Sequence, residues 1–169
     1  MYRPQDMAQD KVVAYKRSRF STRLPTDRLY APSHFWMAET EPEIWRVGFT
    51  KFATRMLGDF VEQGFDVKPG DPVKVGQEIG WVEGFKARSD IYSVMSGEFL
   101  GVNPALGEDI TLADTDPYGR GWLYGVRGKP DPNSLDVQGY TQLLDLTIDK
   151  MQNDVHDGFE DEKDQACQT

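Results

Sequence analysis

The sequence predicts a mainly β fold, a flattened β-barrel or sandwich that carries one short helix and one C-terminal helix. Beyond Gly58 the chain consists of short apolar runs separated by glycine and proline: DFVEQGFDV, KPGDPVKVGQ, EIGWVE, SDIYSV and GEFLGV. This spacing of short strands is typical of all-β sandwiches and barrels. The chain has 169 residues, of which 38% are hydrophobic, so it is long enough for one core but short for two.

A strand and the short helix precede Gly58. IWRVGF, which begins at Ile44, is rich in β-branched and aromatic residues and predicts a strand. KFATRML then predicts one or two helical turns that Gly58 ends. Pro69 with Gly70, and then Gly76, predict tight turns, because proline fixes φ and glycine accepts a positive φ.

A further turn is predicted at Ser96-Gly97. It should return the chain antiparallel and place Phe99 and Val102 in the core. WLYGVR, which begins at Trp122, supplies another strand.

The C-terminal helix is predicted to start after Asn133 or Ser134, either of which can cap it. We expect the helix to pack on the sandwich through a rough apolar face at helical spacing. The residues of this face are Leu135, Tyr140, Leu143, Leu144, Ile148 and Met151.

Three segments are expected along the chain. Residues 1–29 form an N-terminal extension without a sustained period, in which VVAYKRSRF suggests a short strand or helical turn against the body. Residues 30–151 form the domain. Residues 152–169 are strongly acidic and predict a disordered, solvated tail, with electrostatic docking as the alternative.

Composition narrows the classes of partner. The net charge is −9 and the pI is about 4.7, which oppose nucleic-acid binding through counterion release. No run approaches the roughly 18 apolar residues of a membrane span, so we expect a cytoplasmic protein without a membrane partner. The single cysteine, Cys167, has no second thiol for a disulfide or a metal site.

The sequence contains few residues that could act in catalysis. The two histidines are His34, which lies among aromatic residues, and His156, which lies in the acidic tail. No HExxH, GxSxG, Walker or GxGxxG pattern occurs, so a self-contained enzyme and a metal site are not expected. For His34 we expect a structural or orienting role in preference to proton transfer.

One lysine lies in a notable context. Lys86 is part of EGFKA, between the strand-like runs EIGWVE and SDIYSV, and this arrangement predicts a hairpin with Lys86 at or near its tip. A hairpin presents an amine at a fixed position for a modifying enzyme. Taken alone, an exposed lysine in a turn is more often an ordinary solvated charge.

The surrounding sequence resembles the glycine-cleavage H-protein family. ExxKA followed by SDIYSVMSGEFLGVNPAL is similar to the lipoyl-attachment hairpin of that family, with Lys86 at the modified lysine and Ala87 after it. The tripeptide LGD at Leu57, the run GDPVKVGQEIGWVE, and DPYGRGWL from Asp116 agree in order with family landmarks. The resemblance covers about residues 30 to 150.

The resemblance implies a fold of the biotinyl/lipoyl-carrier type and a carrier role. Lipoate would be amide-linked to Lys86, and its arm would carry intermediates between partner enzymes. The implied partners are a lipoate ligase or lipoyl transferase, and dihydrolipoamide dehydrogenase-like or heterodisulfide-reductase-like enzymes. Biotin carriers use a related fold, but Phe85 and Ala87 flank the lysine where biotin carriers typically have methionines.

The departures from the family pattern suggest a particular pathway. HFW replaces HEW at His34, EGFKA replaces ESVKA, and FVEQGF lacks the usual apolar FVxLP character. These changes resemble the lipoate-binding proteins of the heterodisulfide-reductase-like sulfur-oxidising system, which we place ahead of glycine cleavage. An unmodified β-sandwich binding module is a further alternative.

Several residues near Lys86 have two interpretations. Glu83 is either a contact for the ligase or a partner, or a solvated carboxylate at a strand end. The aromatic residues Trp81, Phe85, Tyr92 and Trp122 could line a cleft for the arm, but aromatic residues on short strands are more often core. We therefore expect these four to pack in the interior.

Overall fold

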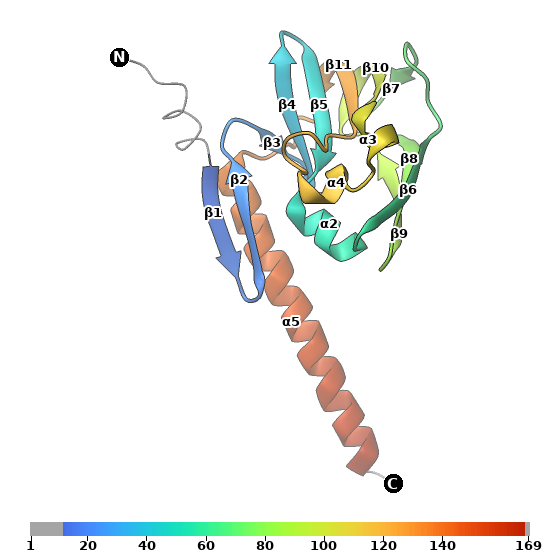
Figure 1. Ribbon diagram of the computed structural model, residues 1–169. Helices are drawn as coiled ribbons and strands as arrows, with labels where there is room; N and C mark the ends of the chain where they lie inside the picture. The colour runs from blue at the N-terminus through green and yellow to red at the C-terminus, as the bar shows by residue number, and fades with distance from the viewer. Residues whose placement is uncertain (1–11, 168–169) are drawn as a thin grey trace.

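The computed structural model describes the backbone of residues 12–167 and the side chains of residues 12–154. Its main body is a sandwich of two antiparallel sheets (Figure 1). The larger sheet has the strand order β3 (Leu29–Tyr30), β4 (Phe35–Glu41), β5 (Ile44–Phe49), β11 (Tyr124–Pro130), β10 (Met95–Val102) and β7 (Pro72–Val73). The smaller sheet has the order β6 (Phe60–Phe65), β8 (Glu78–Gly84) and β9 (Arg88–Tyr92). The mainly β prediction is confirmed, as a sandwich whose sheets do not close into a barrel.

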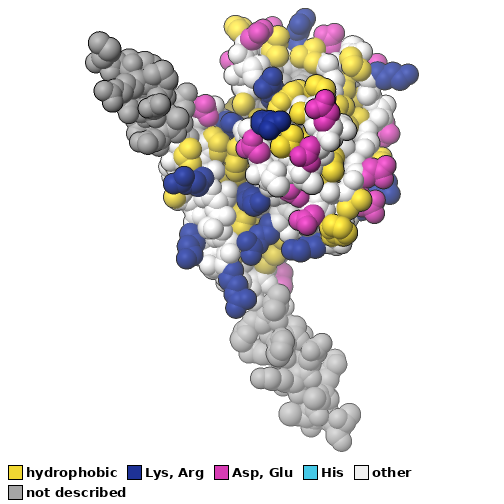
Figure 2. Space-filling model, in the orientation of Figure 1, with side chains coloured by type: hydrophobic (Ala, Val, Ile, Leu, Met, Phe, Trp, Pro, Cys, Tyr) yellow, Lys and Arg dark blue, Asp and Glu magenta, His cyan; other side chains and the backbone are white. Residues whose placement is uncertain are grey.

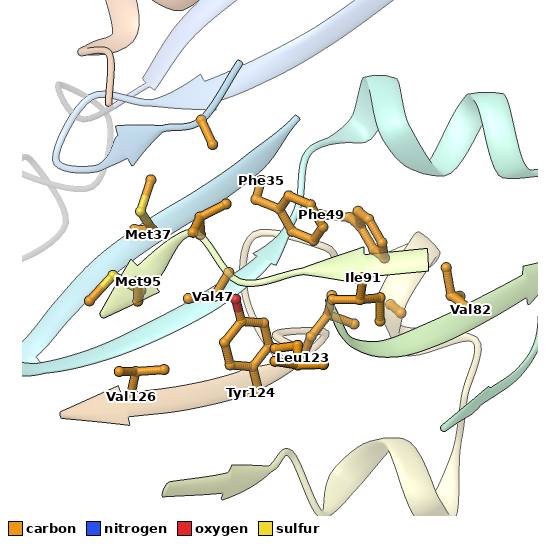
Figure 3. Packing of buried hydrophobic residues seen from close by; sticks show 14 of the residues in the cluster. Phe35, Met37, Val47, Phe49, Val82, Ile91, Met95, Leu123, Tyr124 and Val126 are labelled. Carbon is orange, nitrogen blue, oxygen red and sulfur yellow. The ribbon is translucent and has the colours of Figure 1, made fainter. Parts of the chain in front are cut away.

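The main core lies between these sheets (Figure 3). Side chains of the larger sheet, such as Val47 and Phe99, meet Val82 and Ile91 of the smaller sheet, and all four are fully buried. The core position of Phe99 is confirmed. That of Val102 is wrong, because Val102 ends β10 and its side chain is 37% exposed.

The short helix is confirmed as α2 (Lys51–Leu57), directly after β5. Gly58 follows with φ of +79°, in the left-handed region that glycine adopts without strain, and its N–H donates to the carbonyl of Thr54. Two one-turn helices, α3 (Ala105–Glu108) and α4 (Leu112–Thr115), connect β10 to β11. Helix α2 and the turn after it therefore lead straight into β6.

The turn predicted at Ser96-Gly97 is wrong, since both residues lie inside β10. The chain bends at residues 93–94 and passes there from the smaller to the larger sheet. Gly97 lies opposite Gly128 of β11, and a Cβ at Gly97 would overlap the carbonyl oxygen of Arg127. Close approach of two strands, and not a turn, requires this glycine.

The N-terminal extension contains a β-hairpin of β1 (Val12–Arg17) and β2 (Phe20–Pro25). It lies along the C-terminal helix (Figure 1). The Tyr15 hydroxyl donates to Asp145 at 2.7 Å, and the Arg17 guanidinium makes two hydrogen bonds to Asp149, at 2.7 and 2.8 Å. The strand suggested by VVAYKRSRF is thus present, while residues 1–11 lie outside the described part.

The C-terminal helix is α5 (Val137–Cys167). Its cap is Asp136, whose carboxylate accepts the N–H of Gly139 at 2.8 Å, so the predicted caps Asn133 and Ser134 are wrong. The backbone continues as helix through residues 152–167, the segment for which we expected disorder. His156 and Cys167 lie beyond the side chains that the structure describes. No helix in the described part is long and apolar enough to cross a membrane.

A second core joins the extension to α5. The helix contributes Tyr140, Leu144 and Ile148, as predicted, while Met151 is 39% exposed and lies outside this core. Tyr140 stacks on Tyr30 with ring centroids 4.7 Å apart. The helix therefore packs on the hairpin and on one edge of the sandwich. The buried members of this core are Tyr15, Phe20, Leu24, Tyr30, Trp36, Phe52, Val137, Tyr140, Leu144 and Ile148.

Truncating Leu144 should reveal how much this second core stabilises the protein. We expect Leu144→Ala to lower the free energy of unfolding by about 2–5 kcal/mol, because it leaves a cavity in a fully buried site. Leu146 on the same helix is 71% exposed, so Leu146→Ala should change it by less than about 0.5 kcal/mol. Urea unfolding measures both variants, and equal losses would contradict the packing described.

Candidate functional site

The described structure places Lys86 in the hairpin that joins β8 to β9. Residues 85–87, here called the lysine tip, follow the last strand pair, Glu83 with Arg88. The N–H of Gly84 donates to the carbonyl of Ala87 at 2.9 Å and closes the tip, and the Lys86 side chain is exposed. The hairpin predicted around this lysine is present.

Two backbone hydrogen bonds hold the lysine tip to the turn after α2. The N–H of Lys86 donates to the carbonyl of Leu57 at 2.9 Å, and the N–H of Phe85 donates to the carbonyl of Asp59 at 3.0 Å. The Leu57-Gly58-Asp59 tripeptide, noticed in the sequence as a motif only, therefore positions the lysine. It acts through main-chain oxygen atoms, which sequence reasoning did not foresee.

Two glycines allow the tip and the turn to approach each other. A Cβ at Gly84 would overlap the carbonyl oxygen of Leu57. A Cβ at Gly58 would lie 2.9 Å from Cγ of Lys86. Gly84 excludes larger side chains for steric reasons, and Gly58 disfavours them mainly because its φ is +79°.

The Lys86 amine lies on an exposed side chain. Its Nζ donates weakly, at 3.3 Å, to the carbonyl of Arg55, and among the described residues no carboxylate forms an ion pair with it. A surface hollow of about 520 Å³ lies beside it. The hollow is lined by Lys51, Thr54, Arg55, Gly58, Asp59, Phe85, Lys86, Asp114 and Thr115.

The other candidate residues near Lys86 are exposed to different degrees. Glu83 and Ala87 are exposed near the tip, and no hydrogen bond or ion pair in the described part joins Glu83 to Lys86. The core expectation is wrong for Phe85 and Tyr92, which are 80% and 48% exposed. Phe85 lies beyond the last strand pair, where no sheet covers it, and Tyr92 points away from the side of β9 on which Ile91 is buried.

Two of the four aromatic residues expected in the core, Trp81 and Trp122, are half-buried. Trp81 stacks under the guanidinium of Arg88, at 4.8 Å from the ring centroid, and Trp122 lies under Arg46 at 4.6 Å. Arginine side chains therefore cover these rings on the surface.

His34 lies apart from the lysine tip, in the second core. Its Nδ1 is 2.9 Å from the hydroxyl of Tyr140, which also hydrogen-bonds Thr50, and its ring packs against Phe52. Burial lowers the pKa of His34 from 6.5 to about 4, because the charged imidazolium is poorly solvated there. A neutral imidazole that orients Tyr140 agrees with a structural role.

This burial predicts a pH-dependent stability. The unfolded chain binds a proton at His34 near pH 6.5, whereas the folded chain binds it only near pH 4, so stability falls as the pH decreases between these values. We expect the wild type to lose about 3 kcal/mol more than His34→Asn between pH 7 and pH 4. Denaturant unfolding at both pH values measures this difference, and parallel losses would refute a neutral buried His34.

Comparisons with known proteins agree with the architecture. Residues 28–146 match the family model described as "Glycine cleavage H-protein". The glycine cleavage system H protein of Corynebacterium jeikeium is 42% identical over 124 residues, which cover 70% of this chain and 95% of that protein. The H protein of Shewanella sp. strain ANA-3 is 37% identical over 129 residues, which cover 73% of this chain and 98% of that protein.

A solved structure is similar as well. The crystal structure of a glycine cleavage system H protein from Mycobacterium marinum matches with a TM-score of 0.64 at 35% identity. The match covers 70% of this chain and 97% of that one, and the β1–β2 hairpin lies before the residues matched by the family model. The chain therefore belongs to the glycine cleavage H-protein family.

Proposed function

We propose that this chain is a lipoyl carrier whose lipoyl group is amide-linked to Nζ of Lys86. The observation that carries the proposal is an exposed amine on a tip whose backbone is hydrogen-bonded to Leu57 and Asp59. A modifying enzyme can bind such a rigid tip without first ordering it, so little conformational entropy opposes the encounter. The open space beside the amine leaves room for the attached group.

The residues present fit a lipoyl group. When attached, the group would supply a redox-active dithiolane at the end of an arm that spans roughly 14 Å from the lysine Cα. The chain itself supplies position: Leu57 and Asp59 hold the tip, and Gly58 and Gly84 permit the contact. In this proposal the chain is a substrate of its partner enzymes, namely a lipoate ligase or lipoyl transferase and a dihydrolipoamide dehydrogenase-like enzyme.

The proposed pathway is glycine cleavage. The relatives support this reading better than sulfur oxidation with heterodisulfide-reductase-like partners, which the sequence departures had favoured. One of those departures is internal: Phe35 of HFW is 4% exposed and stacks on Phe49 at 4.6 Å. A buried replacement changes the core and says little about the surface that partners contact.

Mass spectrometry and an exchange assay test the proposal in sequence. After co-expression with a lipoate ligase, we expect one lipoyl group per chain, mapped to the peptide that contains Lys86. The lipoylated chain should then support glycine–bicarbonate exchange by glycine decarboxylase at a rate close to that of an ordinary H protein.

Each other outcome has a distinct meaning. No adduct would favour an unmodified binding module, and labelling by biotin would indicate a biotin carrier. An adduct reproducibly on another lysine would refute Lys86 as the site. Full lipoylation without glycine–bicarbonate exchange would refute the glycine-cleavage assignment and favour the sulfur-oxidation alternative.

A further inference from the structure

A second hollow, of about 450 Å³, lies on the outer face of the larger sheet beside the loop of residues 116–122. We call it the arginine–indole hollow. Two tryptophans and three arginines line it, and the other lining residues are small or polar, apart from Tyr118. The five residues that define it are Arg28, Trp36, Arg46, Arg120 and Trp122.

Two of the arginines lie over indole rings. The guanidinium carbon of Arg28 lies 4.3 Å from the ring centroid of Trp36, and that of Arg46 lies 4.6 Å from Trp122. The Trp36 ring is itself fixed, because its Nε1 donates to the carbonyl of Pro117 at 2.8 Å. For the exposed Arg46, contact through the face of the guanidinium leaves the N–H donors at its edge available.

The positive charges of this hollow are only partly compensated. Arg28 forms an ion pair with Asp27, whose carboxylate lies 3.8 Å from Nε, whereas no carboxylate among the described residues forms an ion pair with Arg46 or Arg120. Nε and Nη1 of Arg28 are buried without a hydrogen-bond partner. Burial also lowers the pKa of Arg28, so the site disfavours the cation that it holds.

One carboxylate, Asp116, lines the hollow, and it is already engaged. Its Oδ2 accepts the backbone N–H of Arg120 at 2.9 Å. Three guanidinium groups and two carboxylates, those of Asp116 and Asp27, leave one positive charge in excess, in a protein whose net charge is −9. A local excess of this sign on an acidic protein attracts anions at close range.

We infer that the arginine–indole hollow binds a small dianion, either an oxyanion of phosphorus or sulfur or a dicarboxylate. Planar guanidinium forks match the oxygen atoms of these groups and can bind them in a bidentate manner. Arg46 and Arg120, which no carboxylate pairs with among the described residues, can each bind two oxygen atoms of one anion, so a dianion with several oxygen atoms is favoured over chloride or acetate. Asp116 directly follows Thr115, which lines the hollow beside Lys86, so the two hollows are neighbours along the chain.

Titration of the full, unlipoylated chain tests this inference independently of the proposed carrier function. The probes are sodium phosphate, sulfate and malonate at pH 7.5, with sodium chloride added to keep the ionic strength constant. The four tryptophan indole N–H signals are followed by nuclear magnetic resonance. We expect saturable shifts of the Trp36 and Trp122 signals, with half-saturation at or below about 1 mM for at least one dianion.

The chain offers a matched control in the pair Arg88 and Trp81, an arginine stacked on an indole outside this hollow. The double variant Arg46→Gln/Arg120→Gln should raise the half-saturation concentration at least tenfold, whereas Arg88→Gln should leave it unchanged. The three substituted arginines, Arg46, Arg88 and Arg120, are exposed. Thermal unfolding of each variant verifies the fold.

Three results would overturn the inference. They are equal shifts with chloride alone, equal shifts at Trp81, or unchanged binding in the double variant. Comparison of phosphate, sulfate and malonate then identifies which dianion chemistry the hollow prefers.

Discussion

Lys86→Arg should abolish lipoyl attachment and carrier turnover while leaving the fold intact. An arginine guanidinium stays protonated and is a poor nucleophile for amide formation, so a ligase cannot modify it. The Lys86 side chain is exposed and makes one long hydrogen bond, so we expect a change in the free energy of unfolding within about 0.5 kcal/mol. Intact mass, partner-coupled turnover and thermal unfolding, measured on one preparation, separate chemistry from stability.

Lys74→Arg is the matched control, because Lys74 is an exposed lysine in the turn before β8. It should retain full lipoylation and turnover. If Lys86→Arg still supported turnover, the carrier proposal would fail. If it unfolded many degrees lower, Lys86 would have a structural role instead.

Gly84→Ala should separate the lysine tip from α2 without removing the lysine. The added Cβ would overlap the carbonyl oxygen of Leu57, so strand β8 and the turn after α2 must move apart. We expect a loss of about 1–3 kcal/mol in the free energy of unfolding, as for other overpacked sites. We also expect at least a tenfold lower kcat/KM for lipoylation, because the hydrogen bonds that position Lys86 would be weakened.

Gly107→Ala provides the control, since a Cβ at Gly107 meets no atom within 4 Å. Its lipoylation kinetics should equal those of the wild type. Normal lipoylation of a folded Gly84→Ala chain would show that the contact with Leu57 does not position the lysine.

The N-terminal hairpin and the end of α5 lie outside the residues that the family model matches. The family model ends at residue 146, whereas hydrogen bonds from Tyr15 and Arg17 reach α5 at Asp145 and Asp149. The N-terminal hairpin is therefore attached where the family part of the helix ends. Figure 2 shows that Lys and Arg side chains gather over this hairpin, in contrast to the acidic net charge of the chain.

The sequence by itself determined the local features of this protein. β-Branched runs between glycine and proline predicted the strands, and KFATRML before Gly58 predicted α2. EGFKA between two strand-like runs predicted the hairpin that carries Lys86. These features depend on neighbours a few residues away, so pattern and turn chemistry were sufficient.

Only the tertiary structure decided the contacts between distant segments. Main-chain carbonyls of Leu57 and Asp59 receive the N–H groups of the lysine tip, and a main-chain oxygen atom has no signature in side-chain sequence. Gly97 resembled a turn residue because a glycine inside a strand that a close partner strand requires looks the same in sequence as a glycine in a turn. Phe85 is exposed and Phe35 buried although both are phenylalanines on or beside strands, because burial depends on what the rest of the fold places over them.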